Sequence, residues 1–505
     1  MKRSKFSLSN YKLLSCDMGE LVPIGITEVL PGDTIQQATS ALIRCSPLMA
    51  PVMHPVNVRI HHWFVPHRIL WDDFEDFITG GPDGHDVSVF PTVTMPSDSG
   101  AAVGSLADYL GVPPGVANLE VSALPFRAYN MIYNEWYRDQ DLQSEVPLST
   151  ASGSDTTTSL SLLNASWEKD YFTSARPWEQ KGPAVTIPLG TTAPVEVTGV
   201  GFYGTGTGMT SQSGVRDSGG STATYSQAWK DHTSPQEPRL IVKSTNNTSG
   251  QQFPDIKGIA DLSNASAVTV GVLREALALQ RYEEARARYG SRYVEYLRYL
   301  GVRSSDARLQ RPEYLGGGRQ TIQFSEVLQT AEGTYPVGEM RGHGISAVRT
   351  NRYRRFFEEH GYIITIMSVR PRTIYAQGLF RHWNKRTKED FWQRELEHIG
   401  QQEVLNKELY AASPQPEGVF GFQDRYDEYR RTESTIAGEF RSTLLDHWHM
   451  ARIFSNAPAL NADFVKAVPT KRTFAVPSQD VLYVMANHSI QARRLVSQIG
   501  KSFIY

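Results

Sequence analysis

The sequence predicts a mainly β fold with one core. A very long insertion, which we call the excursion, separates the strands of that core in the sequence. Residues 56–71 are β-branched and aromatic, which is typical of a buried strand. The nearest comparable segments, residues 361–370 and 480–489, lie hundreds of residues further along the chain. Short Pro and Gly turns separate several extended segments in the first part of the sequence. Because the strand needs a partner and nothing directly after it supplies one, we expect these distant segments to pair with it.

The extended segments before residue 72 follow one another closely. Residues 20–29 are extended and end in a Pro-Gly turn, residues 41–52 form another apolar stretch, and the strand at residues 56–71 follows. Residues 1–15 are expected to form a basic, polar arm. Its anchors would be Phe6, Leu8 and Tyr11.

Helices are predicted inside the excursion and again near residue 400. Apolar side chains in residues 124–137 recur every three or four positions, as one buried helix face requires. The same period predicts helices over residues 268–289 and 292–300. Thr387 can cap a helix that runs to about residue 410, with an acid three positions on. The three glycines from residue 316 to 318 predict a tight turn.

The middle of the excursion has an unusual composition. Residues 139–238 contain eleven Asp or Glu against five Lys or Arg, and large apolar side chains are rare in residues 199–220 and 245–252. Such segments cannot bury enough apolar surface to form a core. Two interpretations remain open: an exposed loop used for recognition, or a disordered spacer.

Charge and cysteine content limit the class of protein. The formal net charge of -2 excludes a polycation, so nucleic-acid binding would require local basic patches. The two cysteines, Cys16 and Cys45, exclude a disulfide framework and are expected to be buried thiols in a reducing compartment. No apolar stretch follows the basic N-terminus, so we expect no secretion signal, and no apolar run is long enough to span a membrane.

No stretch of the sequence predicts a catalytic centre. Three glycines between residues 199 and 204 match a dinucleotide-binding loop, but the helix that such a loop requires is not predicted after it. His61 and His67 would lie too far apart on a strand to share one metal ion, and His447 with His449 lacks a third ligand. We therefore expect no enzymatic activity, no metal ion and no cofactor.

Two parts of the chain are strongly basic. Residues 341–388 contain eleven Lys or Arg against two Glu, with aromatic residues interleaved. The last forty residues contain six basic residues against one acidic residue. Cations beside stacking rings suit single-stranded nucleic acid, and arginine is equally favoured in contacts between subunits. Both interpretations remain open.

Several long segments together resemble one family. In the first half they are Asp17-Met-Gly-Glu-Leu-Val-Pro23, Glu28-Val-Leu-Pro-Gly-Asp-Thr34, Ala50-Pro-Val-Met-His-Pro55, Arg59-Ile-His-His-Trp-Phe-Val-Pro-His-Arg68 and Phe77-Ile-Thr-Gly-Gly81. In the second half they are Arg308-Leu-Gln-Arg-Pro-Glu-Tyr-Leu-Gly-Gly-Gly318, Val369-Arg-Pro-Arg-Thr-Ile-Tyr375 and Gln401-Gln-Glu-Val-Leu-Asn-Lys-Glu408. The chain thereby resembles the major capsid protein of the Microviridae, in particular the gokushoviruses, except between about residues 139 and 260.

This resemblance implies a fold: a single eight-stranded antiparallel jelly roll with very long insertions between strands, which contain several α-helices. The discontinuous core would comprise about residues 14–71, 345–375 and 440–490. Residues 72–344 would be insertions, and residues 490–505 a basic C-terminal segment.

The resemblance also implies partners and a location. About sixty copies, built from pentamers, would form a T = 1 icosahedral shell around a circular single-stranded DNA genome. Other virion proteins, an internal DNA-binding protein and a pilot protein, would accompany it, and a bacterial cell-surface receptor would be its outer partner. The protein would be made and assembled in the host bacterial cytoplasm and would end in the virion.

Two sets of residues are candidates for these contacts. The DNA-facing candidates are Arg493, Arg494, Lys501, Lys471 and Arg472. Residues 199–255 would form a surface protrusion that meets the host. Its candidate residues are Gly199, Gly204, Gly220, Tyr225, Trp229 and Asn247.

The main alternative is a secreted or surface carbohydrate-binding β protein. It explains the β core and the aromatic residues, but neither the missing secretion signal nor the basic segments. A bacterial nucleic-acid-binding protein is a third interpretation, and it would not require the long Ser- and Gly-rich excursion.

Overall fold

A computed structural model of the chain describes residues 3–82, 85–183, 185, 270–289, 293–303, 305–330 and 337–498, together with the backbone of seven short strands between residues 195 and 260. The chain divides into two compact units. The first comprises Met1–Lys181 with Glu284–Tyr505, and the second comprises Gly182–Glu283.

The predicted central strand is β5 (Val56–Pro66), and its partners come from far along the chain. It pairs over its whole length with β18 (Gly361–Pro371), which pairs in turn with β3 (Leu21–Val29). On its other side lies β15 (Glu313–Leu328). The expected pairing with residues 361–370 is therefore confirmed. The expected pairing with residues 480–489 is wrong, because that segment pairs elsewhere.

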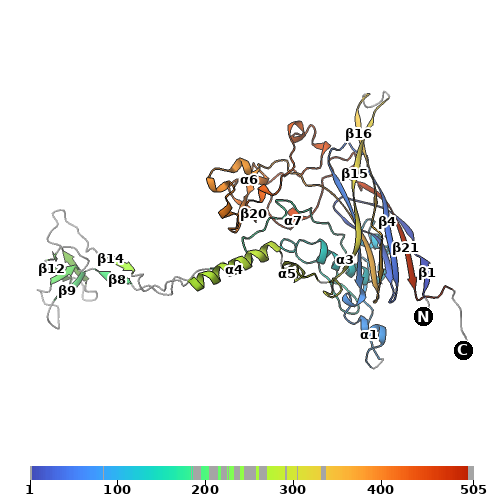
Figure 1. Cartoon of the computed structure of the whole chain (residues 1–505), viewed down its shortest axis with the longest axis horizontal. Helices are drawn as coiled ribbons and strands as arrows, with labels where there is room; N and C mark the ends of the chain where they lie inside the picture. Colours follow the sequence, from blue (N-terminus) through green and yellow to red (C-terminus); the bar gives the residue numbers. More distant parts are fainter. Residues whose placement is uncertain are drawn as a thin grey trace. The chain divides into compact units, whose positions relative to one another are not determined.

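The other half of the sheet is built around β4 (Thr34–Cys45) and β21 (Leu482–Arg494), which pair along almost their whole length. Strand β16 (Met340–Arg349) pairs with β4 and links it to β15. The sheet has ten strands in all, in the order β1-β21-β4-β16-β15-β5-β18-β3, with β2 and β17 attached to β21 and β4. Figure 1 shows the part of this sheet that contains β1, β21, β4, β16 and β15. The added strands are β1 (Ser4–Ser7), β2 (Asn10–Cys16) and β17 (Tyr353–Phe356). Residues 4–16 are thus edge strands rather than an arm.

Strand β15 belongs to both halves of the sheet. Residues 313–322 pair with β5 and residues 323–328 pair with β16. The predicted turn at Gly316 to Gly318 is wrong, because these glycines lie inside the strand. A Cβ atom on Gly317 would lie 2.3 Å from the Ile60 carbonyl oxygen, and one on Gly318 would lie 2.7 Å from that of Arg349. Glycine is required here because the neighbouring backbones approach too closely for a side chain.

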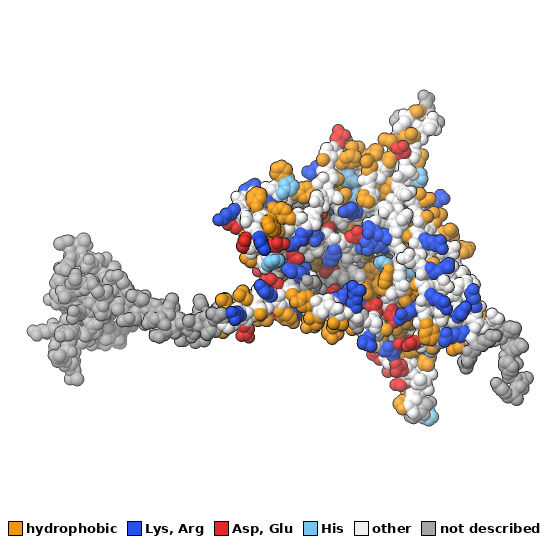
Figure 2. Space-filling view, in the orientation of Figure 1, with side chains coloured by type: hydrophobic (Ala, Val, Ile, Leu, Met, Phe, Trp, Pro, Cys, Tyr) orange, Lys and Arg blue, Asp and Glu red, His pale blue; other side chains and the backbone are white. Residues whose placement is uncertain are grey.

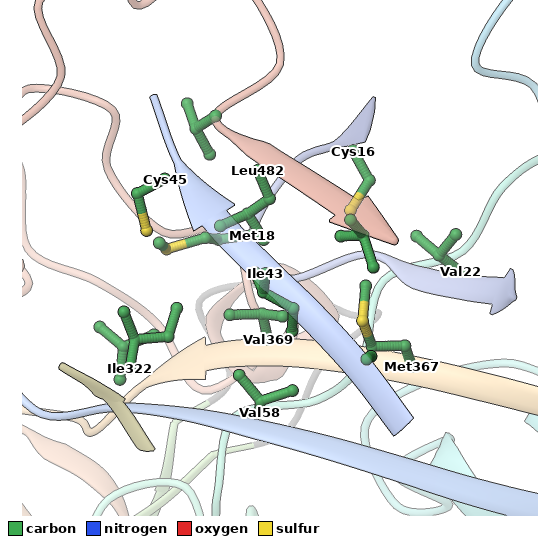
Figure 3. Close-up of a cluster of buried hydrophobic side chains, with 14 of the residues drawn as sticks. Cys16, Met18, Val22, Ile43, Cys45, Val58, Ile322, Met367, Val369 and Leu482 are labelled. Carbon is green, nitrogen blue, oxygen red and sulfur yellow. The ribbon is translucent and has the colours of Figure 1, made fainter. Parts of the chain in front are cut away.

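The sheet curls so that its two halves enclose the main core. Figure 3 shows side chains from β4, β5, β18 and β21 meeting in this cluster, with Ile43, Val58, Val369 and Leu482 among them. Cys16 and Cys45 are buried, free thiols, as predicted. Burial raises the pKa of both, that of Cys45 to about 12. The mainly β prediction is confirmed, and the curled antiparallel sheet is consistent with a jelly roll, for which the count of eight strands stays a prediction.

Helices cover the outer side of the β3, β5 and β18 half. Helix α3 (Leu124–Ile132) continues into a π-helical turn at Tyr133–Tyr137, which matches the predicted helix. Its buried stripe, including Phe126, Tyr129 and Ile132, packs with Trp63 and Ile364 of the sheet. The short helices and strands around it are α1 (Phe74–Thr79), α2 (Leu106–Leu110), β6 (Thr92–Thr94) and β7 (Glu120–Ser122).

Two further predicted helices are confirmed, as α4 (Val270–Tyr289) and α5 (Tyr293–Tyr299). The helix predicted from Thr387 to about residue 410 is wrong. Thr387 and Asp390 form the expected capping box, but only one 3-10 turn follows, Lys388–Asp390. The Tyr426 hydroxyl lies 3.0 Å from the carbonyl oxygens of Glu389 and Phe391 and replaces their helical partners.

The last part of the segment predicted as a helix forms a strand instead. Strand β19 (Gln401–Leu405) pairs with β20 (Val419–Asp424), and α6 (Asn406–Leu409) lies between them in the sequence. Short helical turns complete the first unit. They are α7 (Ala462–Val465), His67–Ile69, Arg381–Asn384, Arg394–Leu396, Asp427–Tyr429, Gly438–Arg441 and Asp446–Trp448.

Between residues 195 and 260, the described backbone of the second unit consists of paired short strands, and α4 begins within the same unit. The strands are β8 (Val195–Thr198), β9 (Val200–Tyr203), β10 (Gly214–Asp217), β11 (Thr224–Tyr225), β12 (Gln227–Asp231), β13 (Arg239–Lys243) and β14 (Lys257–Ala260). Among the helices that the structure describes, none is both long enough and apolar enough to cross a membrane.

Candidate functional site: the uncovered sheet face

One face of the sheet has no covering layer among the residues that the structure describes. Along β21, buried and exposed residues alternate, because successive side chains of a strand point to opposite sides. The buried set faces the core, and the other set faces away from it. Tyr11 and Leu13 of β2 lie on the outward side with exposed fractions of 72% and 68%. We call the outward residues of β1, β2, β21, β4, β16 and β17 the uncovered sheet face.

The strand register places an apolar row in the middle of this face. Leu13, Met485, Leu42 and Ala347 are aligned across four neighbouring strands. Tyr483 and Arg44 lie in the next row along. A contiguous apolar row on a protein surface is typical of a binding surface.

Basic residues surround the apolar row. Lys5, Arg493, Thr34 and Phe356 are aligned across β1, β21, β4 and β17, and the Arg3 guanidinium lies 4.9 Å from the centre of the Phe356 ring. No outward strand position on this face holds Asp or Glu. Five basic residues of the face have no ion-pair partner among the described residues: Lys5, Arg44, Arg349, Arg354 and Arg493.

Of the predicted DNA-facing residues, Arg493 lies on this face. Arg494, the next residue in the strand, points the other way. Its Nε atom lies 3.0 Å from a carboxylate oxygen of the fully buried Asp33, and its guanidinium donates to the Glu28 carbonyl. Burial raises the pKa of Asp33, and Arg494 opposes that shift. Arg494 therefore stabilises the turn between β3 and β4.

The other predicted DNA-facing residues are also engaged or not described. Arg472 donates to the carbonyl oxygens of Asp446, His449 and Ala451, at 2.8 to 3.0 Å. Lys471 lies 2.6 Å from the Asp17 carboxylate. Lys501 lies outside the described residues. Among the candidates that the structure describes, Arg493 is the one whose side chain has no ion-pair or hydrogen-bond partner.

The host-facing residues are placed only in part. Tyr225 lies in β11 and Trp229 in β12. Gly199, Gly204, Gly220 and Asn247 lie outside the described residues. Their role at a protrusion stays a prediction.

Sequence reasoning missed most of the uncovered sheet face. The basic segment at residues 341–388 does not act as one patch, because Arg349 and Arg354 reach the face while Arg355 pairs with Glu313 at 2.9 Å and Arg381 with Glu408 at 2.9 Å. The alternation of polar and apolar residues in β4 and β21 was the signal that could have identified the rest.

A buried polar cluster lies directly behind the face, between the two halves of the sheet. His488 lies 2.8 Å from the Thr39 hydroxyl and 3.0 Å from the Ile24 carbonyl oxygen. His62 lies 2.9 Å from the Thr365 hydroxyl and 3.1 Å from that of Thr350. These bonds satisfy buried polar groups and fix one half of the sheet against the other.

The buried histidines predict that the protein is sensitive to acid. Burial lowers the pKa of His62 to about 3, with repulsion from His488 and His61 acting the same way. Burial also lowers the pKa of His54, His61 and His67 to about 4. The unfolded chain binds protons at these residues below about pH 6.5, whereas the folded chain does not. The free energy of unfolding should therefore fall between about pH 6.5 and 4, by up to roughly 1.4 kcal/mol per pH unit for each histidine.

Urea unfolding at pH 7 and pH 5 tests this prediction. Burial raises the pKa of carboxyls such as Glu408. Such carboxyls increase the free energy of unfolding as pH falls, opposite to the effect of the histidines. The comparison is therefore made between variants. His62→Gln should have a smaller loss of stability from pH 7 to 5 than the original protein, and His382→Gln, at an exposed position, should not. Equal losses in all three proteins would contradict the assignment.

No metal site is found among the described residues. They contain no group of three or more His, Cys, Asp or Glu that could hold a metal ion. His61 is hydrogen-bonded to the Tyr137 hydroxyl at 2.8 Å, and His449 is hydrogen-bonded to the Phe440 carbonyl oxygen at 2.7 Å. The uncovered sheet face presents cations, aromatic rings and apolar side chains to the surface.

Comparison with known proteins identifies relatives over nearly the whole chain. A family model described as capsid protein (F protein) matches residues 1–502. The chain is 38% identical to capsid protein VP1 of Bdellovibrio phage phiMH2K, covering 95% of this chain and 90% of that protein. It is 34% identical to capsid protein VP1 of Chlamydia phage 1, covering 95% and 92%. It is 33% identical to capsid protein VP1 of Spiroplasma virus 4, covering 95% and 90%.

Proposed function

Because the chain belongs to the family of phage capsid proteins (F protein), we propose that about sixty copies of it close into a T = 1 shell around circular single-stranded DNA, with the uncovered sheet face turned towards the DNA. The chain is a structural component of a virion and not an enzyme. A pentamer would be the building unit, and an internal DNA-binding protein and a pilot protein would share the interior.

The charge of the uncovered sheet face is the observation that supports its orientation towards the DNA. Five cations without ion-pair partners among the described residues lie beside the exposed rings of Tyr11, Tyr483 and Phe356, with no acid at an outward strand position. Single-stranded DNA offers phosphates to the cations and unpaired bases to the rings. Such binding tolerates any sequence, as a shell that packages a whole genome requires, and it weakens with salt.

Binding of a labelled oligothymidylate at several salt concentrations tests this proposal. The triple variant Lys5→Gln, Arg354→Gln, Arg493→Gln removes three charges from the face. The slope of log affinity against log salt should become shallower by about 2, since each lost contact with single-stranded DNA removes roughly 0.7. A control triple at exposed positions elsewhere, Arg386→Gln, Lys388→Gln, Arg394→Gln, should keep the original slope. An unchanged slope in the first triple would exclude this face as the DNA surface.

We also propose that residues 199–255 project from the shell and contact a bacterial surface receptor. Their composition, with few large apolar side chains, supports a solvent-exposed role. Particles that lack these residues should assemble and fail to attach to host cells. Full attachment by such particles would rule the proposal out.

A further inference from the structure

An open cavity of about 750 Å³ lies beside α5, on a different surface from the uncovered sheet face. Trp136 of the π-helical turn and Tyr314 of β15 form its aromatic wall. The Trp136 indole donates to the Pro312 carbonyl at 3.0 Å, and both rings pack on Trp63, with centres 4.7 and 5.0 Å away. The wall is therefore rigid. The remaining lining residues are Arg298, Gly301, Val302, Arg303 and Asp306.

The cavity is positively charged. Its one acid, Asp306, is held by Arg311 through two bonds of 2.9 and 2.5 Å. Arg298 and Arg303 are exposed and have no ion-pair partner among the described residues. Two available guanidinium groups beside two rings favour an occupant that is acidic and also has apolar side chains.

The same chain has a surface with the matching chemistry. Residues 72–82 and 85–90, which the structure describes, contain five acids and no Lys or Arg, and we call them the acidic knob. Helix α1 within it exposes Ile78 at 52%, and Val87 follows at 89%. Phe77 packs against Trp71 with ring centres 4.8 Å apart, and Trp71 is fully buried, so the knob has a fixed base. Figure 2 shows acidic side chains gathered over α1 at the lower end of the unit.

We infer that the acidic knob of one copy docks in the cavity of a neighbouring copy. Ile78 would cover the rings, and Asp76 would meet Arg303. Glu75 lies 3.5 Å from Arg68 of its own chain and would exchange that contact for Arg298. Each copy gives a knob and receives one, which is a heterologous contact of the kind that closes rings of subunits. The inference rests on the proposed function, since it requires that many copies assemble. Exposed apolar residues on an otherwise acidic surface are then covered rather than left in water.

Cross-linking between introduced cysteines tests the contact directly. The two natural thiols are buried, so Ile78→Cys and Val302→Cys would supply the reactive ones. In assembled preparations treated with a short bis-maleimide, the double variant should give a ladder of linked chains longer than dimers, because each copy is linked on two sides. Either single variant should give no cross-linked species longer than dimers. Absence of a ladder from a double variant that still assembles would overturn the inference.

Charge reversal provides an independent test, measured by sedimentation of multi-subunit species. Asp76→Arg and Arg303→Asp should each lower the yield of assembled species at least tenfold, and the combined variant should return it to within about threefold of the original, since one lost ion pair of about 1.4 kcal/mol corresponds to a factor of ten. Asp98→Arg, at an exposed acid outside the knob, should change nothing.

The remaining outcomes separate the two proposals. Normal assembly of both single reversals would overturn the docking contact and leave the shell standing. Normal assembly with less packaged DNA in Arg303→Asp would mean that the cavity binds nucleic acid, which also overturns it. Only monomers from the original protein under all conditions would overturn the shell and, with it, the contact.

Discussion

Replacing Gly317 with alanine should lower the free energy of unfolding by about 3 kcal/mol or more. The new methyl group would lie 2.3 Å from the Ile60 carbonyl oxygen and 2.9 Å from the Tyr314 hydroxyl. The carbonyl belongs to the backbone of β5 and cannot rotate away, so β15 must move off its neighbour. Because β15 is the strand that joins the two halves of the sheet, that movement weakens both. Urea unfolding followed by tryptophan fluorescence measures the change.

Gly153→Ala is the matched control. Gly153 has a positive φ of 83°, and no atom lies within 4 Å of an added Cβ. That variant reports only the cost of a left-handed backbone, about 1–2 kcal/mol. If both variants lose the same stability, close approach of the strands is not the reason for glycine at position 317.

Gly317 also marks the limit of what the sequence predicts about the fold. The pairing of β5 with β18 was predictable, because both strands are long runs of β-branched and aromatic residues. Strand β15 was not, because three consecutive glycines normally indicate a turn and its remaining residues alternate weakly. The register with Ile60 explains the glycines, and that register is a property of the folded sheet.

The uncovered sheet face, too, could be predicted from the sequence only in part. Consecutive arginines at residues 493 and 494 were predicted to share one role, yet on a strand they point to opposite sides, and Arg494 binds Asp33. Alternation within β21 is visible in the sequence. The alignment of Lys5, Arg493 and Phe356 is not, since it brings together three segments that are far apart in the chain.

The family of the chain was easier to predict from the sequence than the arrangement of its surfaces. The resemblance to microviral major capsid proteins rests on segments in both halves of the chain, and the family match over residues 1–502 confirms it. Those segments include the glycines of β15 and the central residues of β5, positions where the curled sheet allows few alternatives. The acidic knob and the cavity beside α5 required the structure, because separate segments form them.

Replacing Arg127 with methionine should cost about 3–5 kcal/mol, the range for breaking a buried ion pair. Arg127 and Asp155 have fully buried side chains, and Arg127 Nε lies 2.8 Å from the Asp155 carboxylate. The other guanidinium nitrogens donate to the carbonyl oxygens of Leu70 and Ala151, at 3.0 and 2.8 Å. This one side chain ties α3 to the end of the segment after β5. Without it, a carboxylate remains buried beside two carbonyl groups that have lost their donor.

The pH dependence of that loss separates electrostatics from packing. Burial pushes the pKa of Asp155 upwards, but bonds from Thr158 and Arg127 outweigh it and lower the pKa below its usual value. In the original protein, the stability that Asp155 contributes is therefore lost as pH falls through this lowered pKa. In Arg127→Met the pKa should rise, so protonation would relieve the buried charge. The stability gap between the two proteins should then narrow from pH 7 to pH 5.

Arg355→Met is the control for this prediction. Its ion pair with Glu313 is half exposed on the arginine side, so its loss should cost at most about 1 kcal/mol. A gap for Arg127→Met that stays constant with pH would mean that lost packing, and not the isolated Asp155 carboxylate, dominates. In that case Asp155→Asn in the methionine background should recover nothing. Recovery of part of the loss by the double variant would show that the charge of Asp155 must be matched for α3 to stay on the sheet.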